Sequence, residues 1–255
     1  MKTIDLNNKR TILTCVVRAV LCGVLLFSLS VIHYPSSASA APNSVYMEEM
    51  TWKEVKDRVA NGAVVAIIPT GGAEQNGPQM AIGKHNTIVR YTAGEIAKRV
   101  NALVAPVIPF SPAGRIYPPE GHMNFPGTVS LSEQTFSRVL EDTARSLKQH
   151  GFRLICFIGD HGGSQEAQRQ IAEKLSDEWE GENVRVAQIS DYYGHNGQDK
   201  WVESVGIKVE NPCAHAGFAD TSELLAINPS QVREHLKGAR SERDYKATGA
   251  MGDSS

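Results

Sequence analysis

The run Val64-Val-Ala-Ile-Ile-Pro69 is short, apolar and uninterrupted, which is typical of a strand buried on both faces. Three similar runs follow at residues 102–108, 154–158 and 184–189. Patterns with helical spacing precede and separate these runs, at residues 52–60, 86–100, 130–150 and 164–179. Strands that alternate with helices predict an α/β fold of three layers, in which a mostly parallel central sheet carries helices on both faces.

Local signals indicate where some of these helices begin and end. Ser130-Leu-Ser-Glu133 resembles a capping box, so we expect Ser130 to cap the third of the long helices. Gly151 is expected to end that helix. Two shorter helices are predicted nearer the C-terminus, at residues 220–227 and 229–236.

Composition excludes several classes of protein. The chain has 255 residues, of which 41% are hydrophobic and 21% are charged, so a disordered protein is not expected. The formal net charge of −2 lacks the basic excess that nucleic-acid binding requires, so no nucleic acid is expected as a partner.

Residues 1–40 have the pattern of a secretory signal peptide. Basic residues come first, an apolar run follows at residues 20–32, and Ser37-Ala-Ser-Ala40 forms a small-residue cleavage site. We expect cleavage after Ala40, which leaves a single periplasmic or secreted domain at 41–255 with no membrane attachment. The alternative is an uncleaved anchor, but the run is short for a bilayer span of about 20 residues.

Two cysteines remain after such cleavage, Cys156 and Cys213. Export would permit a disulfide between them. The apolar, strand-like surroundings of Cys156 favour a free buried thiol instead.

Polar residues follow three of the predicted strands. Glu74 lies in Gly71-Gly-Ala-Glu74 after the first strand, His161 lies in Gly159-Asp-His-Gly-Gly163 after the third, and His215 follows the fourth. Because ligands of such sheets bind beyond the carboxyl ends of the strands, these residues are expected at one rim. With His85, the pair Glu74 and His161 forms a donor set that suits a catalytic Zn²⁺-type site with an open position.

Taken singly, each of these residues has a simpler interpretation. Glu74 suits a solvated loop, His85 a surface position near a helix start, and His161 a structural role. Other catalytic classes lack their motifs, since the chain has no Gly-x-Ser-x-Gly, no phosphate-binding loop and no His-Glu-x-x-His. A flavin- or nucleotide-binding protein would fit the alternation of elements but not the missing phosphate loop. We interpret the aromatic residues Tyr192, Tyr193 and Trp201 as loop packing.

Four segments, in order, resemble the creatininase family of metal-dependent amidohydrolases. They are Pro69-Thr-Gly-Gly-Ala-Glu-Gln-Asn-Gly-Pro78 with Gly83-Lys-His85, Phe125-Pro-Gly-Thr-Val-Ser-Leu131 with His122 upstream, Gly159-Asp-His-Gly-Gly163, and His215-Ala-Gly-Phe-Ala-Asp-Thr-Ser222. The resemblance implies a three-layer α/β fold, hydrolysis of non-peptide or cyclic amide C–N bonds, a divalent metal site and a homo-oligomer. It also implies a further helix after residues 252–253, so we interpret the C-terminal end as truncated or divergent.

The resemblance also implies roles for individual residues. Glu74 and His161 match metal ligands by identity, and His85 matches by position, where the family usually has a metal-bridging Asp. His215 matches the general acid/base. Asp220 is expected to orient His215 or to complete the metal shell. The remaining expected site residues would line the substrate pocket: Asn76, His122, Gly162 and Gly163.

The departures from the family pattern bear on the metal. A neutral imidazole ligates one ion at a given nitrogen, whereas a carboxylate can bridge two. Asn76 stands where the family commonly has His, and Gly163 stands where creatininase has a carboxylate. We therefore expect one Zn²⁺ or Mn²⁺ per chain, which activates a water molecule for attack on a small-molecule amide. The alternative is an exported, non-catalytic binding protein on a degenerate creatininase-like scaffold.

Overall fold

The computed structural model describes residues 44–207 and 215–236. The expectations for the signal peptide, for Cys213 and for the C-terminal end therefore lie outside the described residues. Within the two described ranges, every helix is too short or too polar to traverse a bilayer.

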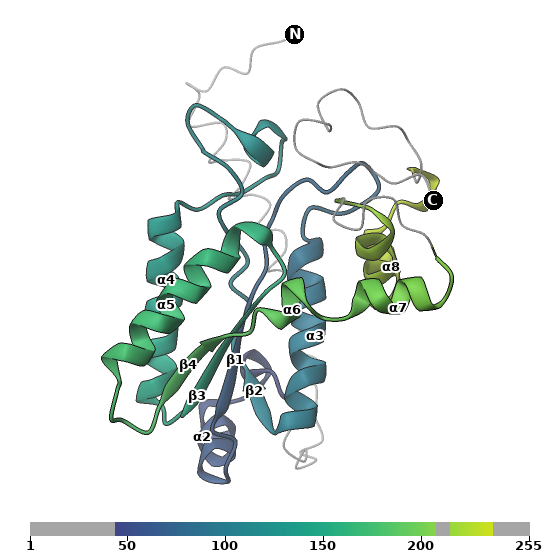
Figure 1. Ribbon diagram of the computed structural model, residues 1–255. Coiled ribbons are helices and arrows are strands. Elements are labelled where there is room, and N and C mark those ends of the chain that lie inside the picture. Colours follow the sequence, from purple (N-terminus) through teal and green to yellow (C-terminus); the bar gives the residue numbers. More distant parts are fainter. Residues whose placement is uncertain (1–43, 208–214, 237–255) are drawn as a thin grey trace, which may run out of the picture. The chain divides into compact units, whose positions relative to one another are not determined.

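The centre of the fold is a parallel sheet in the order β2-β1-β3-β4 (Figure 1). Its strands are β1 (Val65–Thr70), β2 (Ala102–Val104), β3 (Leu154–Gly159) and β4 (Arg185–Gln188). β2 is shorter than predicted. Beyond Val104 the chain leaves regular pairing but still bonds to β1, because Ala105 N–H donates to Ile67 O at 2.9 Å and Ile108 N–H donates to Pro69 O at 2.9 Å.

Helices cover both faces of the sheet, as predicted (Figure 1). On one face, α4 (Glu133–Gln149) and α5 (Gln165–Glu178) pack with α2 (Trp52–Ala60). On the other lies α3 (Lys84–Val100). Neighbouring residues of β1 pack into hydrophobic cores on opposite faces of the sheet. Ala66 and Ile68 pack on the α4 and α5 side, whereas Ile67 packs on the α3 side. This alternation follows from the two-residue period of a strand and explains why the run has no polar position.

The start of α4 differs from the prediction. Ser132, not Ser130, is the N-cap, and its hydroxyl accepts a hydrogen bond from Thr135 N–H at 3.1 Å. The Ser130 hydroxyl instead accepts from Ala113 N–H at 2.9 Å and donates to Gly114 O at 2.8 Å. The capping-box prediction was therefore wrong, because Ser130 is committed to the preceding loop.

The segments after β4 are also more broken than predicted. The segment with the aromatic residues contains two short helices, α6 (Asp191–Gly194) and α7 (Gln198–Ser204). α8 (Phe218–Ile227) begins two residues before its predicted start. The single helix predicted at residues 229–236 is two 3₁₀ turns, η4 (Pro229–Gln231) and η5 (Glu234–Leu236). Three further 3₁₀ turns complete the described elements: η1 (Met47–Glu49), η2 (Gly121–Asn124) and η3 (Gly162–Ser164).

The carboxyl ends of β1 and β3 lie side by side, and this pairing positions the site. Thr70 is opposite Gly159 in the register, and Asp160 N–H donates to Thr70 O at 3.0 Å. The loops that carry Glu74 and His161 therefore leave the sheet as neighbours. Cys156, inside β3, has a free thiol whose pKa is raised by burial.

Candidate metal centre

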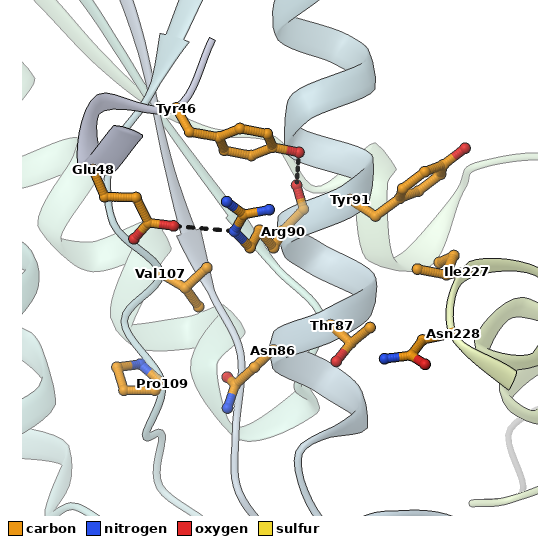
Figure 2. A pocket seen from close by; sticks show the side chains of 10 residues that line it. All are labelled: Tyr46, Glu48, Asn86, Thr87, Arg90, Tyr91, Val107, Pro109, Ile227 and Asn228. Carbon is orange, nitrogen blue, oxygen red and sulfur yellow. Dashed lines mark hydrogen bonds and ion pairs between the residues drawn. The ribbon is translucent and has the colours of Figure 1, made fainter. Parts of the chain in front are cut away.

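A hollow of about 470 Å³ beside α3 is one of the cavities on the described surface (Figure 2). Its lining residues include no histidine or cysteine. Arg90 in its wall is already paired, with Nε 3.0 Å from Glu48 Oε1 and Nη2 2.6 Å from Glu49 Oε1. This hollow therefore lacks the nitrogen and sulfur ligands that a site for Zn²⁺ requires. The histidines predicted to bind metal lie in a different part of the fold.

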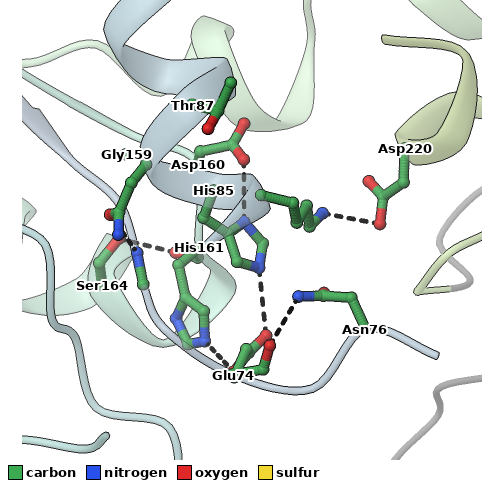
Figure 3. Close-up of polar contacts among 12 residues, drawn as sticks. Glu74, Asn76, His85, Thr87, Gly159, Asp160, His161, Ser164 and Asp220 are labelled. Carbon is green, nitrogen blue, oxygen red and sulfur yellow. Dashed lines mark hydrogen bonds and ion pairs between the residues drawn. The ribbon is translucent and has the colours of Figure 1, made fainter. Parts of the chain in front are cut away.

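Glu74 is the centre of the polar cluster at the carboxyl edge of the sheet (Figure 3). Its side chain is fully buried, with Oε2 2.6 Å from His161 Nε2 and Oε1 3.1 Å from His85 Nε2. Burial alone would raise the pKa of Glu74, but the hydrogen bonds and charges of the two histidines outweigh it and hold the pKa well below its usual range. Glu74 is therefore an anion at neutral pH, with each oxygen directed at an imidazole.

His85 lies in the first turn of α3 and is 3% exposed, so the interpretation of His85 as a surface residue does not hold. Its Nδ1 is 2.8 Å from Asp160 Oδ2. Burial and nearby Lys84 lower the pKa of His85, but its hydrogen bonds to Asp160 and Glu74 outweigh them and raise it. Two carboxylates on opposite ring nitrogens thus fix the ring plane.

His161 follows β3 and caps η3. Gly163 N–H donates to His161 Nδ1 at 3.0 Å, so the neutral ring carries its proton on Nε2, the atom that faces Glu74. The His85 and His161 rings meet edge to face, with centroids 5.2 Å apart.

His122 and His215 also lie near Glu74, at longer distances. His122 Nε2 is 3.7 Å from Glu74 Oε2, and His215 Nδ1 is 3.9 Å from Glu74 Oε1, so neither makes a hydrogen bond to Glu74. Their rings are stacked, with centroids 5.0 Å apart. Burial lowers the pKa of both, to about 4 for His215. Both imidazoles are therefore neutral at pH 7.

Asp220 occupies a place that sequence analysis did not predict. Its Oδ2 lies 2.7 Å from Lys84 Nζ and accepts a hydrogen bond from Ala216 N–H at 3.2 Å. Lys84 is 3% exposed, and a buried ammonium is stable only with a counter-ion. Asp220 therefore neutralises Lys84, and no hydrogen bond joins it to His215 among the described contacts.

Two site residues escaped sequence analysis. Asp160 directly precedes His161 in the motif Gly159-Asp-His-Gly-Gly163, and Lys84 directly precedes His85. The available signal was a carboxylate at a strand end beside His161, but nothing in the sequence says which histidine it contacts. That contact depends on how α3 packs against the end of β3.

Two groups of side chains around Glu74 have the composition and spacing of a site for a divalent cation. Glu74, His85 and His161 are all buried, and each offers one ligand atom within 4.8 Å of the others. A second group, which shares Glu74, adds His122 and His215 at the same spacing. His215 Nδ1 and Asn76 Oδ1 are buried with no hydrogen-bond partner. Imidazole nitrogens, a carboxylate oxygen and unpartnered polar atoms fit Zn²⁺ or Mn²⁺.

Comparison with known proteins decides the family. A family model described as creatinine amidohydrolase matches residues 48–255. The chain belongs to the creatininase family. It is 30% identical over 195 residues to the 3-dehydro-scyllo-inosose hydrolase of Thermotoga maritima, and the alignment covers 76% of this chain and 59% of that protein. It is 33% identical over 118 residues to the creatinine amidohydrolase of Pseudomonas putida. That alignment covers 46% of this chain and 45% of the Pseudomonas putida protein.

Solved structures agree with the creatininase assignment. A structure described as "Creatininase Mn" superposes with a TM-score of 0.62 at 26% sequence identity, over 74% of this chain and 75% of that one. The central sheet and its helices therefore have a creatininase-like arrangement. The chain spans only about half the length of the curated creatininase relatives it matches.

This member of the creatininase family differs from the usual pattern at positions that the geometry explains. A Cβ on Gly163 would lie 2.3 Å from Pro112 O, and a Cβ on Gly162 would lie 2.9 Å from Tyr193 Oη. Position 163 therefore has no room for the carboxylate that the resemblance predicts there. Asn76 is fully buried, and its Nδ2 donates to Glu74 O at 3.1 Å, so it supports the loop that carries Glu74.

Proposed function

We propose that this protein is an exported, metal-dependent amidohydrolase that cleaves a non-peptide or cyclic amide C–N bond. The observation that carries the proposal is a buried carboxylate, Glu74, with four histidines around it at the carboxyl edge of a parallel sheet. Membership of the creatininase family supports the reaction class. The same resemblance leads us to propose a homo-oligomer.

We propose that Glu74, His85 and His161 hold one Zn²⁺ or Mn²⁺. All three are buried, and a neutral His85 cannot bridge two ions through one nitrogen. The steric block at Gly163 argues against a carboxylate ligand for the usual second site at that position. A cation in this site would lower the pKa of a bound water toward ~7 and polarise a carbonyl.

The other residues have distinct tasks in this proposal. His215 presents a buried, unpartnered Nδ1 within 3.9 Å of Glu74, so as a neutral imidazole it can take a proton and return it to the leaving nitrogen. His122, which is stacked on His215, would contact substrate beside that ring. The two glycines at 162 and 163 keep side chains out of the approach to His161.

The loss of the usual second-site ligands favours one alternative, a non-catalytic binding protein on the same scaffold. Metal analysis and substrate turnover separate the two. Protein purified without chelator should contain close to one equivalent of Zn²⁺ or Mn²⁺ and should hydrolyse at least one member of a panel of cyclic and linear amides.

An exposed histidine, His150, provides the control for this experiment. His85→Ala and His161→Ala should each lose the metal and the activity, whereas His150→Ala should retain both, because His150 is exposed at the end of α4. Protein with no bound metal and no turnover on any amide would support the binding protein. Two equivalents of metal in the wild-type protein would contradict the single-ion site.

A further inference from the structure

We propose that Asp160 and Tyr192 are positioning residues that hold His85 as a metal ligand, an inference that rests on the proposed metal site. Neither residue has a role in the family pattern on which the sequence analysis relied. The pair acts through the ring of His85 and does not itself reach Glu74.

Asp160 is anchored on both its backbone and its side chain. Its N–H donates to Thr70 O at 3.0 Å, which extends the β1–β3 pairing by one residue. Its Oδ2 lies 2.8 Å from His85 Nδ1 (Figure 3), and its side chain is 14% exposed. A carboxylate fixed to the end of a central strand therefore holds one nitrogen of the His85 ring.

This contact decides which nitrogen of His85 is free. A neutral His85 that donates its Nδ1 proton to Asp160 has its lone pair on Nε2, the atom 3.1 Å from Glu74 Oε1. A carboxylate partner also raises the basicity of an imidazole ligand and fixes its orientation. Asp160 thus selects the tautomer that a cation between His85 and Glu74 requires.

Asp160 also accounts for the charge of the centre. The resemblance places a metal-bridging Asp at position 85, and its replacement by His85 removes one negative charge from the ligand shell. Asp160 restores that charge on the far side of the ring. Lys84 is paired with Asp220, so Asp160 remains the carboxylate partner of His85.

Tyr192 completes the arrangement from α6. Its hydroxyl donates to Asp160 Oδ1 at 3.1 Å, and its ring packs against the core on the α3 side of the sheet. Burial and Asp160 raise the pKa of Tyr192 well above its usual value, so the hydroxyl remains a donor. Asp160 is therefore held through both oxygens, one by His85 and one by Tyr192.

The test measures metal affinity rather than turnover. Full-length protein is stripped with chelator, and the dissociation constant for Zn²⁺ is measured by competition with a chromogenic chelator. Asp160→Asn should weaken Zn²⁺ binding by about 10–100-fold, and Tyr192→Phe by a smaller factor, because such outer contacts tune ligands without replacing them. The visible absorption bands of Co²⁺-loaded protein should change shape in both variants. Matched controls are Asp142→Asn and Tyr91→Phe, both exposed and away from Glu74, which should match wild type.

Each outcome bears on the proposal. If both variants bind Zn²⁺ within about twofold of wild type and their Co²⁺ spectra have the wild-type shape, the positioning role of Asp160 and Tyr192 is refuted. The proposed metal site would not be affected by that result. Wild-type protein that binds neither Zn²⁺ nor Mn²⁺ would overturn the metal site and this inference together. If Asp160→Asn does not fold without metal, Tyr192→Phe decides alone, since it keeps the charge of Asp160 and removes only one hydrogen bond.

Discussion

Replacing Lys84 by methionine should destabilise the metal-free protein by about 3 kcal/mol. Lys84 Nζ lies 2.7 Å from Asp220 Oδ2, and the two side chains are 3% and 23% exposed. At an effective dielectric constant of about 20, the attraction at this distance is worth about 6 kcal/mol before desolvation. Removal of one partner from a buried ion pair costs about 3–5 kcal/mol, since the other charge remains buried. We expect the low end because Asp220 keeps its bond from Ala216 N–H.

The pH dependence of this contribution follows from both pKa shifts. Burial lowers the pKa of Lys84, but attraction to Asp220 and Asp160 outweighs it and raises the pKa above 10.5. Burial raises the pKa of Asp220, but Lys84 outweighs it and lowers the pKa below 3.8. The stabilisation is therefore complete between these two ordinary values. It is lost as the pH falls through the folded pKa of Asp220, or rises through that of Lys84.

The assay is urea denaturation in the presence of chelator, followed by tryptophan fluorescence, for wild type and Lys84→Met at pH 7. Lys53→Met is the matched control, because Lys53 Nζ is also 2.7 Å from a carboxylate, that of Asp57, but both side chains are exposed. The control should not move the midpoint. If Lys84→Met loses no more stability than Lys53→Met, the reasoning about burial is refuted.

Three further predictions concern the proton carrier, a carboxyl group whose pKa is raised by burial, and export. His215→Ala should keep its metal but lose turnover by about 10²–10⁴-fold, and an empty site in this variant would make His215 a ligand. Burial raises the pKa of Glu223 to about 6, so its ionisation opposes folding above that pH. Glu223→Gln should therefore raise the free energy of unfolding at pH 8, by up to about 2 kcal/mol, and leave it unchanged at pH 4; an equal gain at both would exclude ionisation as the cause. Mass spectrometry of the exported protein should find an N-terminus at or near Ala41, and an intact Met1 would contradict cleavage.

The strands and their order along the chain could be predicted because burial on both faces leaves a local signature. β1 and β3 read as uninterrupted apolar runs, and the predicted bounds agree with the structure within one residue. The cap of α4 could not be chosen in the same way. Ser130 and Ser132 are equally suitable by type, and only the packing of the preceding loop engages the first of them.

In the candidate site, too, some features could be predicted from local sequence and others were decided by packing. The sequence alone predicted that Glu74 and His161 lie close together, because parallel strands end at one edge and the glycine-rich loops after them mark that edge. The role of these residues and of His85 as metal ligands stays a prediction. The partners of Lys84 and His85 were decided by tertiary structure. These two residues are adjacent in the first turn of α3, and helix geometry turns them about 100° apart. His85 then meets Asp160 at the end of β3, while Lys84 meets Asp220 in α8. The rotation of α3 against the sheet sets both contacts, and that rotation is a property of the packed core on the α3 side rather than of any local pattern.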